Sequence, residues 1–209
     1  MIYRLNERLV FPDPEHAEPD GLLAVGGDLS TERLLLAYQN GIFPWYSDDT
    51  PILWYSPHER FVIYADELKV STSMKRFLRK EPFTITINKC FRDVIEACAT
   101  IERNDQDGTW ITDDMKAAYI KLHEEGYAHS IEVWQYEELV GGMYGVPMGN
   151  VFCGESMFSR VTNASKAALI HVCSLYKMLD CQMPTEHLAS MGGRLIGRKE
   201  YMAALNNSD

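Results

Sequence analysis

SIEVWQYEELVGGMYGV, residues 130–146, is the stretch that decides the fold of this chain. Its first seven residues largely alternate between polar and apolar, which is the pattern of a half-buried β-strand. A polar Glu137–Glu138 turn follows, and LVGGMYGV (139–146) then predicts a second strand, so that the whole stretch indicates a β-hairpin. VFCG (151–154) continues this antiparallel meander with a third strand.

Helices are predicted on both sides of the meander, because apolar residues recur there at i, i+3, i+4 and i+7. The clearest example is residues 91–98. Other helices are expected after Ser71 or Ser73, from near Thr112 to Gly126 and from about Asn163 to Met178, and further strands at 83–87 and 179–183. This order of helices, meander, helix and strand predicts the α+β class.

Residues 1–62 differ from the rest of the chain, since they are dense in proline and glycine and contain one predicted helix, at roughly 31–40. Ser30 is a suitable N-cap for that helix, and Gly41 a suitable stop. We therefore expect two units: a small, loop-rich N-terminal lobe over residues 1–62 and a second domain over residues 63–209.

Composition and short motifs argue against several kinds of protein. There is no run of eighteen apolar residues, and the opening MIYRLNERLV has charges among its apolar residues, so we expect a cytoplasmic protein with no membrane span. The five cysteines include no C-x-x-C pair, and the six histidines include no H-E-x-x-H motif. We therefore expect neither a disulfide framework nor a metal site.

The charge of the chain is uneven. A formal net charge of −10 argues against general affinity for nucleic acid, because binding phosphates requires local positive charge. Residues 69–80 are an exception, since they contain five basic residues and no acidic one. The four that would share the polar face of the predicted helix are Lys75, Arg76, Arg79 and Lys80. Such a face is often only solvated, but pairing within the helix cannot explain it.

Four long and irregular segments resemble the leucyl/phenylalanyl-tRNA–protein transferases, over nearly the whole chain. They are GLLAVGGDLSTERLLLAYQNGIFPW (21–45), GTWIT (108–112), HSIEVW with LVGGMYGV (129–146), and FCGESMFSRVTNASKAAL (152–169) followed by DCQ (180–182). The resemblance implies a small N-terminal lobe and a C-terminal domain similar to the acyl-CoA N-acetyltransferase fold. It also implies transfer of Leu, Phe or Met from aminoacyl-tRNA to proteins that begin with Arg or Lys, which marks those proteins for degradation.

This reaction is the aminolysis of an activated ester, which needs neither ATP nor a metal ion as a driving force. The sequence indeed lacks G-x-x-x-x-G-K-[ST], so we expect no cofactor. For catalysis we favour Asp180 and Gln182, which are two residues apart on a predicted strand and would point to the same face. An α-ammonium group has a pKa of roughly 7.7–8.0, so orientation should matter more than proton abstraction.

In this hypothesis Asp180 orients Gln182, whose amide contacts the reacting amine or carbonyl. Proton relay by the tRNA ribose, or by the amine of the substrate itself, is an alternative that the sequence leaves open. The resemblance adds Glu155, in GESM, as a residue that would hold the aminoacyl amine or the ribose. A carboxylate placed near a helix N-terminus is the competing interpretation of Glu155.

The resemblance also assigns binding residues for both parts of an aminoacyl-tRNA. Trp45 and Trp110 match the positions that hold the terminal adenosine, where stacking contributes about 1–3 kcal/mol per base. The basic helix corresponds to the tRNA-contacting surface, where phosphate contacts position the ligand without reading its sequence. The residues that match the pocket for the aminoacyl side chain are Met143, Phe152 and Met157, with Tyr119 as a weaker candidate. Core packing is the alternative for all of these apolar residues.

Three other functions remain possible at this stage. An acyl-CoA N-acetyltransferase would usually hold pyrophosphate with a glycine-rich turn at a helix N-terminus, whereas the corresponding turn here, GESMFSRVTNASK, has no second glycine. A peptidoglycan-building aminoacyl-tRNA transferase would need a longer chain. A non-catalytic tRNA-binding module would leave Asp180, Gln182 and Glu155 without a role.

The basic helix generates a first prediction. Replacing Lys75, Arg76, Arg79 and Lys80 by alanine should weaken tRNA binding and flatten its salt dependence. The slope of log K against log salt concentration should become shallower by up to about 3, since each phosphate contact contributes about 0.7–0.9. Titrations of the tRNA at several salt concentrations measure this slope. An unchanged slope would mean that the helix faces only water.

Overall fold

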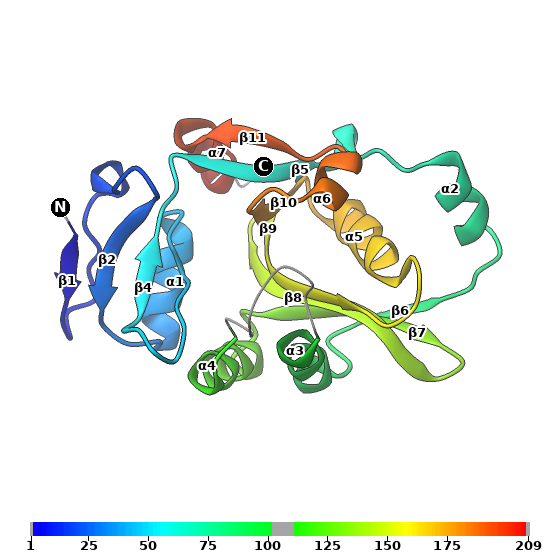
Figure 1. Ribbon diagram of the computed structural model, residues 1–209, viewed down its shortest axis with the longest axis horizontal. Coiled ribbons are helices and arrows are strands. Elements are labelled where there is room, and N and C mark those ends of the chain that lie inside the picture. Colours follow the sequence, from blue (N-terminus) through cyan, green and yellow to red (C-terminus); the bar gives the residue numbers. More distant parts are fainter. Residues whose placement is uncertain (1, 102–110, 208–209) are drawn as a thin grey trace.

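The computed structural model describes residues 2–101 and 111–207, which form two β-sheets with helices packed around them (Figure 1). The larger sheet has seven strands and is antiparallel except for one parallel pair, β9 and β10. In order across the sheet, its strands are β11 (Arg194–Gly197), β5 (Glu59–Tyr64), β10 (Met178–Gln182), β9 (Val151–Ser159), β8 (Glu138–Met148), β7 (His129–Gln135) and β6 (Thr84–Ile87). The fold is thus a mixed α/β arrangement.

The predicted meander forms three neighbouring strands of this sheet, from the central strand β9 through β8 to β7. Its first turn falls one residue earlier than predicted, because Tyr136 and Glu137 both have positive φ, +49° and +70°. Two successive residues with positive φ make the tight hairpin turn whose twist suits antiparallel strands. β9 is also longer than VFCG and continues to Ser159. Glu155 and Met157 therefore lie within a strand, so the competing interpretation of Glu155 as a carboxylate near a helix N-terminus was wrong, and the first part of GESMFSRVTNASK is a strand where a turn was expected.

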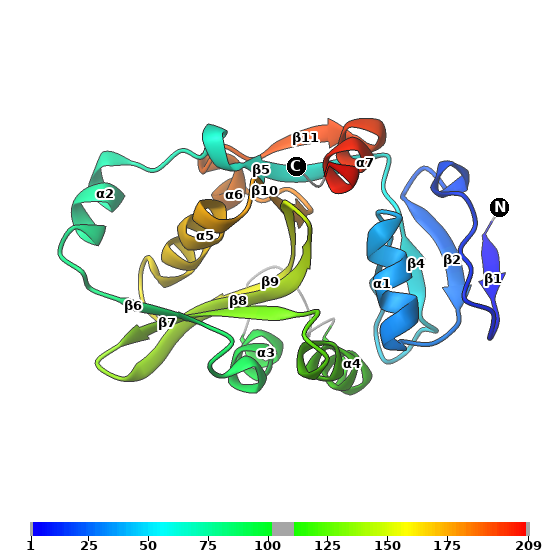
Figure 2. The ribbon, with the colours of Figure 1, turned by 180° about the vertical axis from the view of Figure 1, so that it is seen from behind.

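Helices cover both faces of the larger sheet (Figures 1 and 2). α5 packs on one face, and α3 and α4 lie on the other, where α4 also contacts α1 of the N-terminal part. The helices are α1 (Thr31–Gln39), α2 (Thr72–Leu78), α3 (Phe91–Thr100), α4 (Asp113–Glu124), α5 (Ala164–Leu175), α6 (Glu186–Ser190) and α7 (Arg198–Asn206), with short 3-10 turns at Pro14–His16 and Ala65–Glu67. None of the helices in the described residues is long and apolar enough to cross a membrane.

Local signals explain where several helices begin and end. The side chains of Ser30, Ser71 and Thr112 accept hydrogen bonds from the first turns of α1, α2 and α4, which satisfies backbone N–H groups that have no partner within the helix. Gly126, with φ of +87°, follows the end of α4 as predicted. α5 is shorter than the predicted helix, because Tyr176 is already extended and Met178 begins β10.

The N-terminal part contains more β-structure than the sequence indicated. Besides α1, it has a four-stranded sheet in the order β1 (Tyr3–Leu5), β2 (Leu22–Gly26), β4 (Leu53–Tyr55), β3 (Phe43–Pro44). Three of these strands have only two or three residues, too few for periodicity to be visible in the sequence. β5 begins at Glu59 and belongs to the larger sheet, so it spans the boundary predicted at residues 62 and 63.

One hydrophobic cluster joins the two sheets. It contains Leu34 and Trp54 from the N-terminal part together with Val94 of α3, Tyr119 of α4 and Val146 of β8. A second cluster lies between α5 and the other face of the larger sheet. Because apolar burial is the main favourable contribution to folding, the shared cluster holds the N-terminal part firmly against α4.

Gly145 provides a test of how closely β8 and β9 approach each other. A Cβ atom at this position would lie 2.2 Å from the carbonyl oxygen of Cys153, next to the register shift between the two strands. Gly145→Ala should therefore lower the free energy of unfolding by about 1–3 kcal/mol, the usual cost of overpacking. Gly197→Ala is the matched control, since nothing lies within 4 Å of its Cβ position. Urea denaturation of both variants measures the difference, and equal stabilities would contradict the close approach.

Candidate functional site

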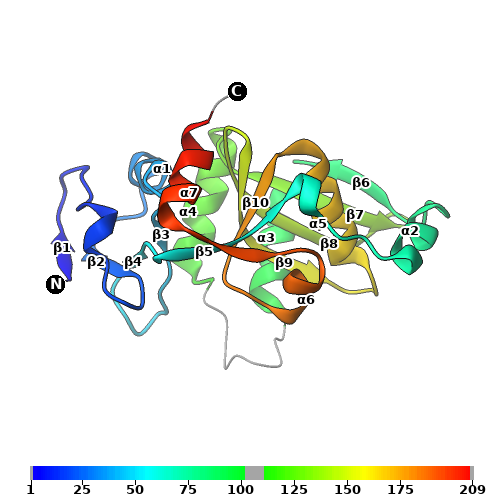
Figure 3. The same ribbon diagram turned by 90° about the horizontal axis from the view of Figure 1, so that it is seen from above.

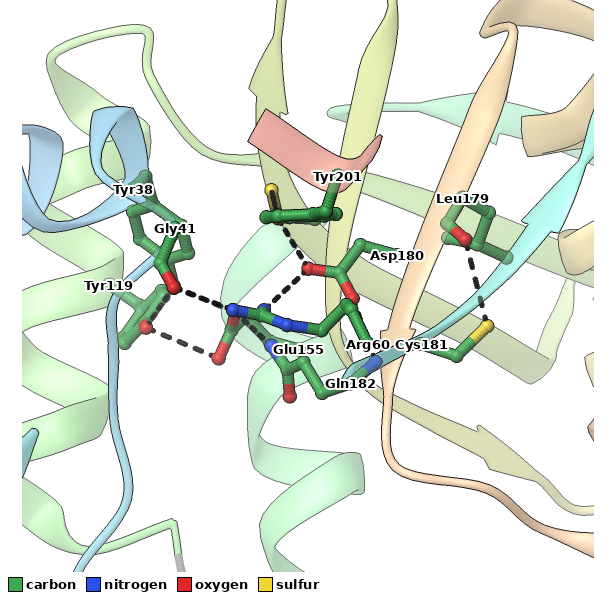
Figure 4. Close-up of polar contacts among 11 residues, drawn as sticks. Tyr38, Gly41, Arg60, Tyr119, Glu155, Leu179, Asp180, Cys181, Gln182 and Tyr201 are labelled. Atoms are coloured by element: carbon green, nitrogen blue, oxygen red, sulfur yellow. Dashed lines mark hydrogen bonds and ion pairs between the residues drawn. The ribbon is translucent and has the colours of Figure 1, made fainter. Parts of the chain in front are cut away.

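The candidate site lies where β9 and β10 separate. The parallel pairing of these strands ends at Cys153 opposite Asp180. Beyond that point β10 has a register shift against β5, and Gln182 takes a positive φ of +61°. The backbone irregularity directs the side chain of Gln182 back towards Glu155 on β9 (Figure 4). A bulge of this kind re-aims a side chain at a sheet edge or a binding site.

Glu155 is the centre of the polar network in Figure 4. It is buried, and its carboxylate accepts hydrogen bonds from Tyr38 Oη at 2.7 Å and Tyr119 Oη at 3.2 Å. The two tyrosine hydroxyls also contact each other. Gln182 Nε2 donates a third hydrogen bond to this carboxylate, at 3.0 Å. The carboxylate is thus held by groups from α1, α4 and β10, which are far apart in the sequence.

Burial decides the ionisation of Glu155. Removal from water raises the pKa of its carboxyl group to about 7, and the nearby carboxylate of Asp180 acts in the same direction. Hydrogen bonds from Tyr38, Tyr119 and Gln182 act in the opposite direction and limit the rise. Burial also raises the pKa of both tyrosine hydroxyls well above the ordinary value, so that they remain donors. Glu155 can therefore gain or lose a proton near neutral pH.

Asp180 is also buried, but its partners are different. Its Oδ2 atom accepts hydrogen bonds from Arg60 Nη1 at 2.8 Å and Tyr201 Oη at 2.7 Å. Its Oδ1 atom accepts the backbone N–H of Gln182, also at 2.8 Å. Burial alone would lower the pKa of the Arg60 guanidinium, but its anionic and hydroxyl neighbours, Asp180 above all, raise it beyond the ordinary value.

The predicted pair, Asp180 and Gln182, is brought together by a different geometry from the one expected. Regular alternation along a strand would point both side chains to one face. The strand is irregular between these two residues, so alternation does not determine where their side chains point. Instead, Asp180 points into the core and fixes the backbone of Gln182, whose side chain extends to Glu155. The proximity of the two residues arises from the bulge.

A pocket of about 300 Å³ lies beside these carboxylates. Its walls are Met143, Gly154, Glu155, Ser156, Met157, Leu179, Asp180, Cys181, Thr185, His187 and Leu188. Two of the predicted pocket residues, Met143 and Met157, are thus among its walls. Phe152 is not; it is fully buried in the adjoining cluster that also contains Met143 and Leu179. Tyr119 reaches the site only through its hydrogen bond to Glu155.

The N-terminal part reaches the site through one short segment, residues 38–45. Tyr38 Oη donates a hydrogen bond to Glu155, and the carbonyl oxygen of Gly41 accepts a hydrogen bond from Arg60 Nη2 at 2.6 Å. Trp45 lies at the end of this segment with 40% of its surface exposed and its ring edge against Tyr55. An exposed indole ring is available for stacking. Trp110 lies outside the described residues.

The four basic residues predicted to contact tRNA are far from this network. α2 projects at the opposite end of the molecule from the N-terminal sheet (Figures 1 and 3). Lys75 and Arg76 lie on the helix and Arg79 and Lys80 directly after it, and all four are exposed. None of the four forms an ion pair with another residue in the described ranges.

Three of the five cysteines, Cys98, Cys153 and Cys173, are buried, and the other two are partly buried. All five are free thiols, and Cys153 lies with its Sγ atom 3.7 Å from Tyr201 Oη. Burial raises the pKa of the Cys153 thiol far above its ordinary range, so it stays protonated. Across residues 2–101 and 111–207, no three His, Cys, Asp or Glu side chains are grouped as a metal site would require.

Sequence reasoning missed three residues of the network: Tyr38, Arg60 and Tyr201. Tyr38 lies in the predicted helix at 31–40, where an apolar face commonly includes a tyrosine, and so it gave no signal of a site. Arg60 opens the run RFVIY (60–64), and a charged residue at the start of an otherwise apolar strand is a usable signal, because a buried cation needs a partner. Tyr201 gives no such signal, since an amphipathic helix commonly buries a tyrosine.

Comparisons with known proteins agree with one another. The profile for leucyl/phenylalanyl-tRNA protein transferase matches residues 62–206, and the profile for the N-terminal domain of that protein matches residues 27–58. A leucyl/phenylalanyl-tRNA–protein transferase of Syntrophobacter fumaroxidans is 54% identical over 209 residues, covering 98% of this chain and 89% of that protein. One of Flavobacterium psychrophilum is 52% identical, covering 98% and 99%.

A similarity to a solved structure is much weaker. A functionally unknown conserved protein of Staphylococcus epidermidis has a TM-score of 0.44 at 12% identity, covering 84% of this chain and 68% of that one. Such a score is too low to assign the fold.

The raised pKa of Glu155 predicts a pH-dependent stability. An unfolded glutamate has a pKa of about 4.3, whereas the folded value is about 7. The folded state therefore binds this proton more tightly, and the stability that results is lost as pH rises from 4.3 through 7. The loss amounts to about 3 kcal/mol by pH 8, at 1.36 kcal/mol per pKa unit.

Glu155→Gln has no such proton to lose. The difference in unfolding free energy, variant minus unmodified protein, should therefore be larger at pH 8 than at pH 5. Urea denaturation of both proteins at both pH values measures it. Glu138→Gln, at an exposed position, is the control and should leave the pH dependence unchanged. A Glu155→Gln protein with an unchanged pH dependence would show that the carboxyl group titrates as it does in water.

Proposed function

This chain belongs to the leucyl/phenylalanyl-tRNA–protein transferase family, and we propose that it transfers Leu, Phe or Met to proteins that begin with Arg or Lys. It is an aminoacyltransferase: the amino acid moves from tRNA to the N-terminus of a protein. The observation that supports the proposal most directly is a titratable carboxylate, Glu155, in contact with Gln182 beside an apolar pocket. The acceptor would thereby be marked for degradation.

The chemistry requires no further reactant. The free α-amine of the acceptor attacks the ester carbonyl of the aminoacyl-tRNA, a C–N bond forms, and the C–O bond to the ribose breaks. The proton released by the amine goes finally to the ribose oxygen of the departing tRNA. Because the ester is already activated, the site has to hold the two reactants in the right geometry and move one proton.

We assign these tasks to Glu155 and Gln182. A carboxylate with a pKa of about 7 lies close to the pKa of an α-amine, roughly 7.7–8.0. Proton exchange between the two groups therefore costs little near neutral pH. Gln182 supplies an amide that can contact the reacting amine or carbonyl, and its position is fixed through Asp180. Asp180 is buried, and we assign it a positioning role through the backbone of Gln182.

The apolar pocket would receive the side chain of the transferred amino acid. Met143 and Met157 line it, and a flexible thioether adapts to linear, branched and aromatic chains alike. Phe152 would support the pocket from the core behind Met143, and Tyr119 would act through Glu155. The walls also include Ser156, Thr185 and His187, so apolar side chains are favoured only where the two methionines line the pocket, because a polar group buried against them would be unpaired.

The tRNA would bind along the length of the molecule. Trp45, and Trp110 from outside the described residues, would stack on the terminal adenosine near the site. The basic residues around α2 lie at the other end, where phosphates farther along the tRNA could reach them (Figure 3). In this proposal the exposed basic residues around α2 supply the positive charge with which an acidic protein binds a long nucleic acid.

We also propose three features, two of organisation and one of location. Residues 1–62 would act as a small lobe and residues 63–209 as a domain similar to the acyl-CoA N-acetyltransferase fold. Support comes from the β9–α5–β10 connection, which places one parallel pair inside an antiparallel sheet at the site. A cytoplasmic location is the third feature, since aminoacyl-tRNA is made and used there.

The direct test mixes the protein with Leu-tRNA and a peptide that begins with Arg, and weighs the peptide by mass spectrometry. We expect a gain of one leucine residue. The same peptide with an acetylated N-terminus is the control and should not change, because its amine is blocked. A peptide that begins with Asp should react far more slowly. If the free Arg-peptide is not lengthened by Leu-, Phe- or Met-charged tRNA, the proposal is wrong.

Asp180→Asn separates binding from turnover. It keeps the size of the side chain but removes the charge that Arg60 and Tyr201 hold in place. We expect kcat to fall by about tenfold or more, while the affinity for charged tRNA changes by no more than about twofold. Rapid-quench transfer assays and tRNA titrations measure the two quantities. A loss of tRNA affinity instead would mean that this aspartate belongs to the tRNA site.

A further inference from the structure

Arg60 joins the N-terminal part of the chain to the site, and no role has yet been assigned to it. Arg60 lies near the start of β5 and is buried, with a relative exposure of 3%. The two terminal nitrogens of its guanidinium group have different partners: Nη1 donates to Asp180 Oδ2 at 2.8 Å and Nη2 to the carbonyl oxygen of Gly41 at 2.6 Å. A guanidinium is suited to such bridging, because it carries several donors in a fixed plane.

Aromatic rings confine this guanidinium as well. Its Cζ atom lies 4.8 Å from the centre of the Phe43 ring and 4.5 Å from that of Tyr201. Both contacts are within the range of cation–π attraction. Phe43 belongs to the N-terminal segment and Tyr201 to α7, so the cation is enclosed by both parts of the chain.

The bonds of Asp180 show how this position could matter for catalysis. Arg60 and Tyr201 occupy its Oδ2 atom, which fixes the rotation of the carboxylate and aims Oδ1 at the backbone N–H of Gln182. That N–H belongs to the residue with positive φ at the bulge. A left-handed conformation is costly for a non-glycine residue and persists only when its surroundings hold it. The side chain of Gln182 then reaches Glu155.

We propose that Arg60 is a positioning residue for the transfer reaction. It acts through Asp180 to hold Gln182 in the position needed for the reaction, and it fixes this position relative to residues 38–45. The inference rests on the function proposed above for Asp180 and Gln182. Residues 38–45 carry both Tyr38, which bonds Glu155, and Trp45, the proposed adenosine platform. Arg60 thus sets the relative position of the donor-binding segment and the residue that orients the amine.

Arg60→Lys is the main test, because it keeps the cation and so avoids leaving Asp180 buried without a counter-charge. The ammonium group of a lysine is a compact charge, and it cannot bridge Asp180 and the carbonyl oxygen of Gly41 as the planar guanidinium group does. We expect kcat for transfer of Leu to an Arg-peptide to fall by about fivefold or more, with KM for Leu-tRNA changed by less than about twofold. A general loss of structure would lower the amount of active enzyme and the melting temperature together.

Arg198→Lys is the matched control. Arg198 is also a buried arginine that donates to a backbone carbonyl, that of Ser56 at 2.6 Å, but the hydrogen bonds of its guanidinium do not include Asp180. Its kcat should stay within about twofold of the unmodified value. Melting temperatures of both variants, measured in parallel, show whether they are equally well folded.

A double variant tests whether Arg60 acts through Asp180. Arg60→Gln combined with Asp180→Asn removes both charges of the pair, which is better tolerated than removing one. If the proposal holds, its kcat is no lower than that of Asp180→Asn alone, since the route is already broken. This comparison also decides the matter if Arg60→Lys does not fold.

Two results would overturn the inference. One is a folded Arg60→Lys protein with the unmodified kcat, and the other is a folded double variant whose kcat is clearly lower than that of Asp180→Asn alone. A different result, in which the unmodified protein itself fails to lengthen the peptide, would overturn the proposed function instead. The two failures are therefore distinguishable.

Discussion

The structure around the site depends on the burial of two carboxylates close to each other. Glu155 and Asp180 come from neighbouring parallel strands, and ionised carboxylates in such an environment repel each other and lose their hydration. The protein resolves this differently for each group. Asp180 has a cation, Arg60, whereas Glu155 has only neutral donors and a pKa of about 7. One carboxylate is thus held in an ion pair with an arginine, whereas the pKa of the other lies near neutral pH.

This division requires the two parts of the chain to be assembled. Tyr38 and Gly41 belong to the N-terminal part, while Tyr119 and Tyr201 come from helices of the larger part. If the N-terminal segment moved away, Glu155 would lose a donor and Arg60 would lose its carbonyl partner. The shared hydrophobic cluster under α1 and α4 therefore stabilises the ionisation states of the site as well as the fold. Packing and chemistry cannot be separated here.

How much of this could be predicted depends on the range of the interaction concerned. The meander and the helices over 91–100 and 113–124 are encoded by local periodicity and caps, and they lie where the sequence placed them, within a few residues. The short strands of the N-terminal sheet lack any period and were not predicted. Arg60 pairs with a residue 120 positions away and Tyr38 with one 117 away, contacts that no local pattern encodes. The Gln182 bulge was missed for a related reason, since a regular strand was the simplest expectation from DCQ.

The same reasoning explains how an acidic chain can serve a polyanionic substrate. A net charge of −10 would repel tRNA at a distance, and screening limits that repulsion to about 8 Å at physiological salt. Close to the surface, local groups matter more than the net charge. In the proposed binding mode these are the exposed cations at α2 and, near the site, Glu155 with its raised pKa and Asp180 paired with Arg60. A permanently ionised, unpaired carboxylate beside the pocket would oppose the approach of a phosphate-bearing 3′ end. A carboxyl group that can be protonated near neutrality opposes it less, and in the proposed mechanism its ionised fraction accepts the proton of the amine.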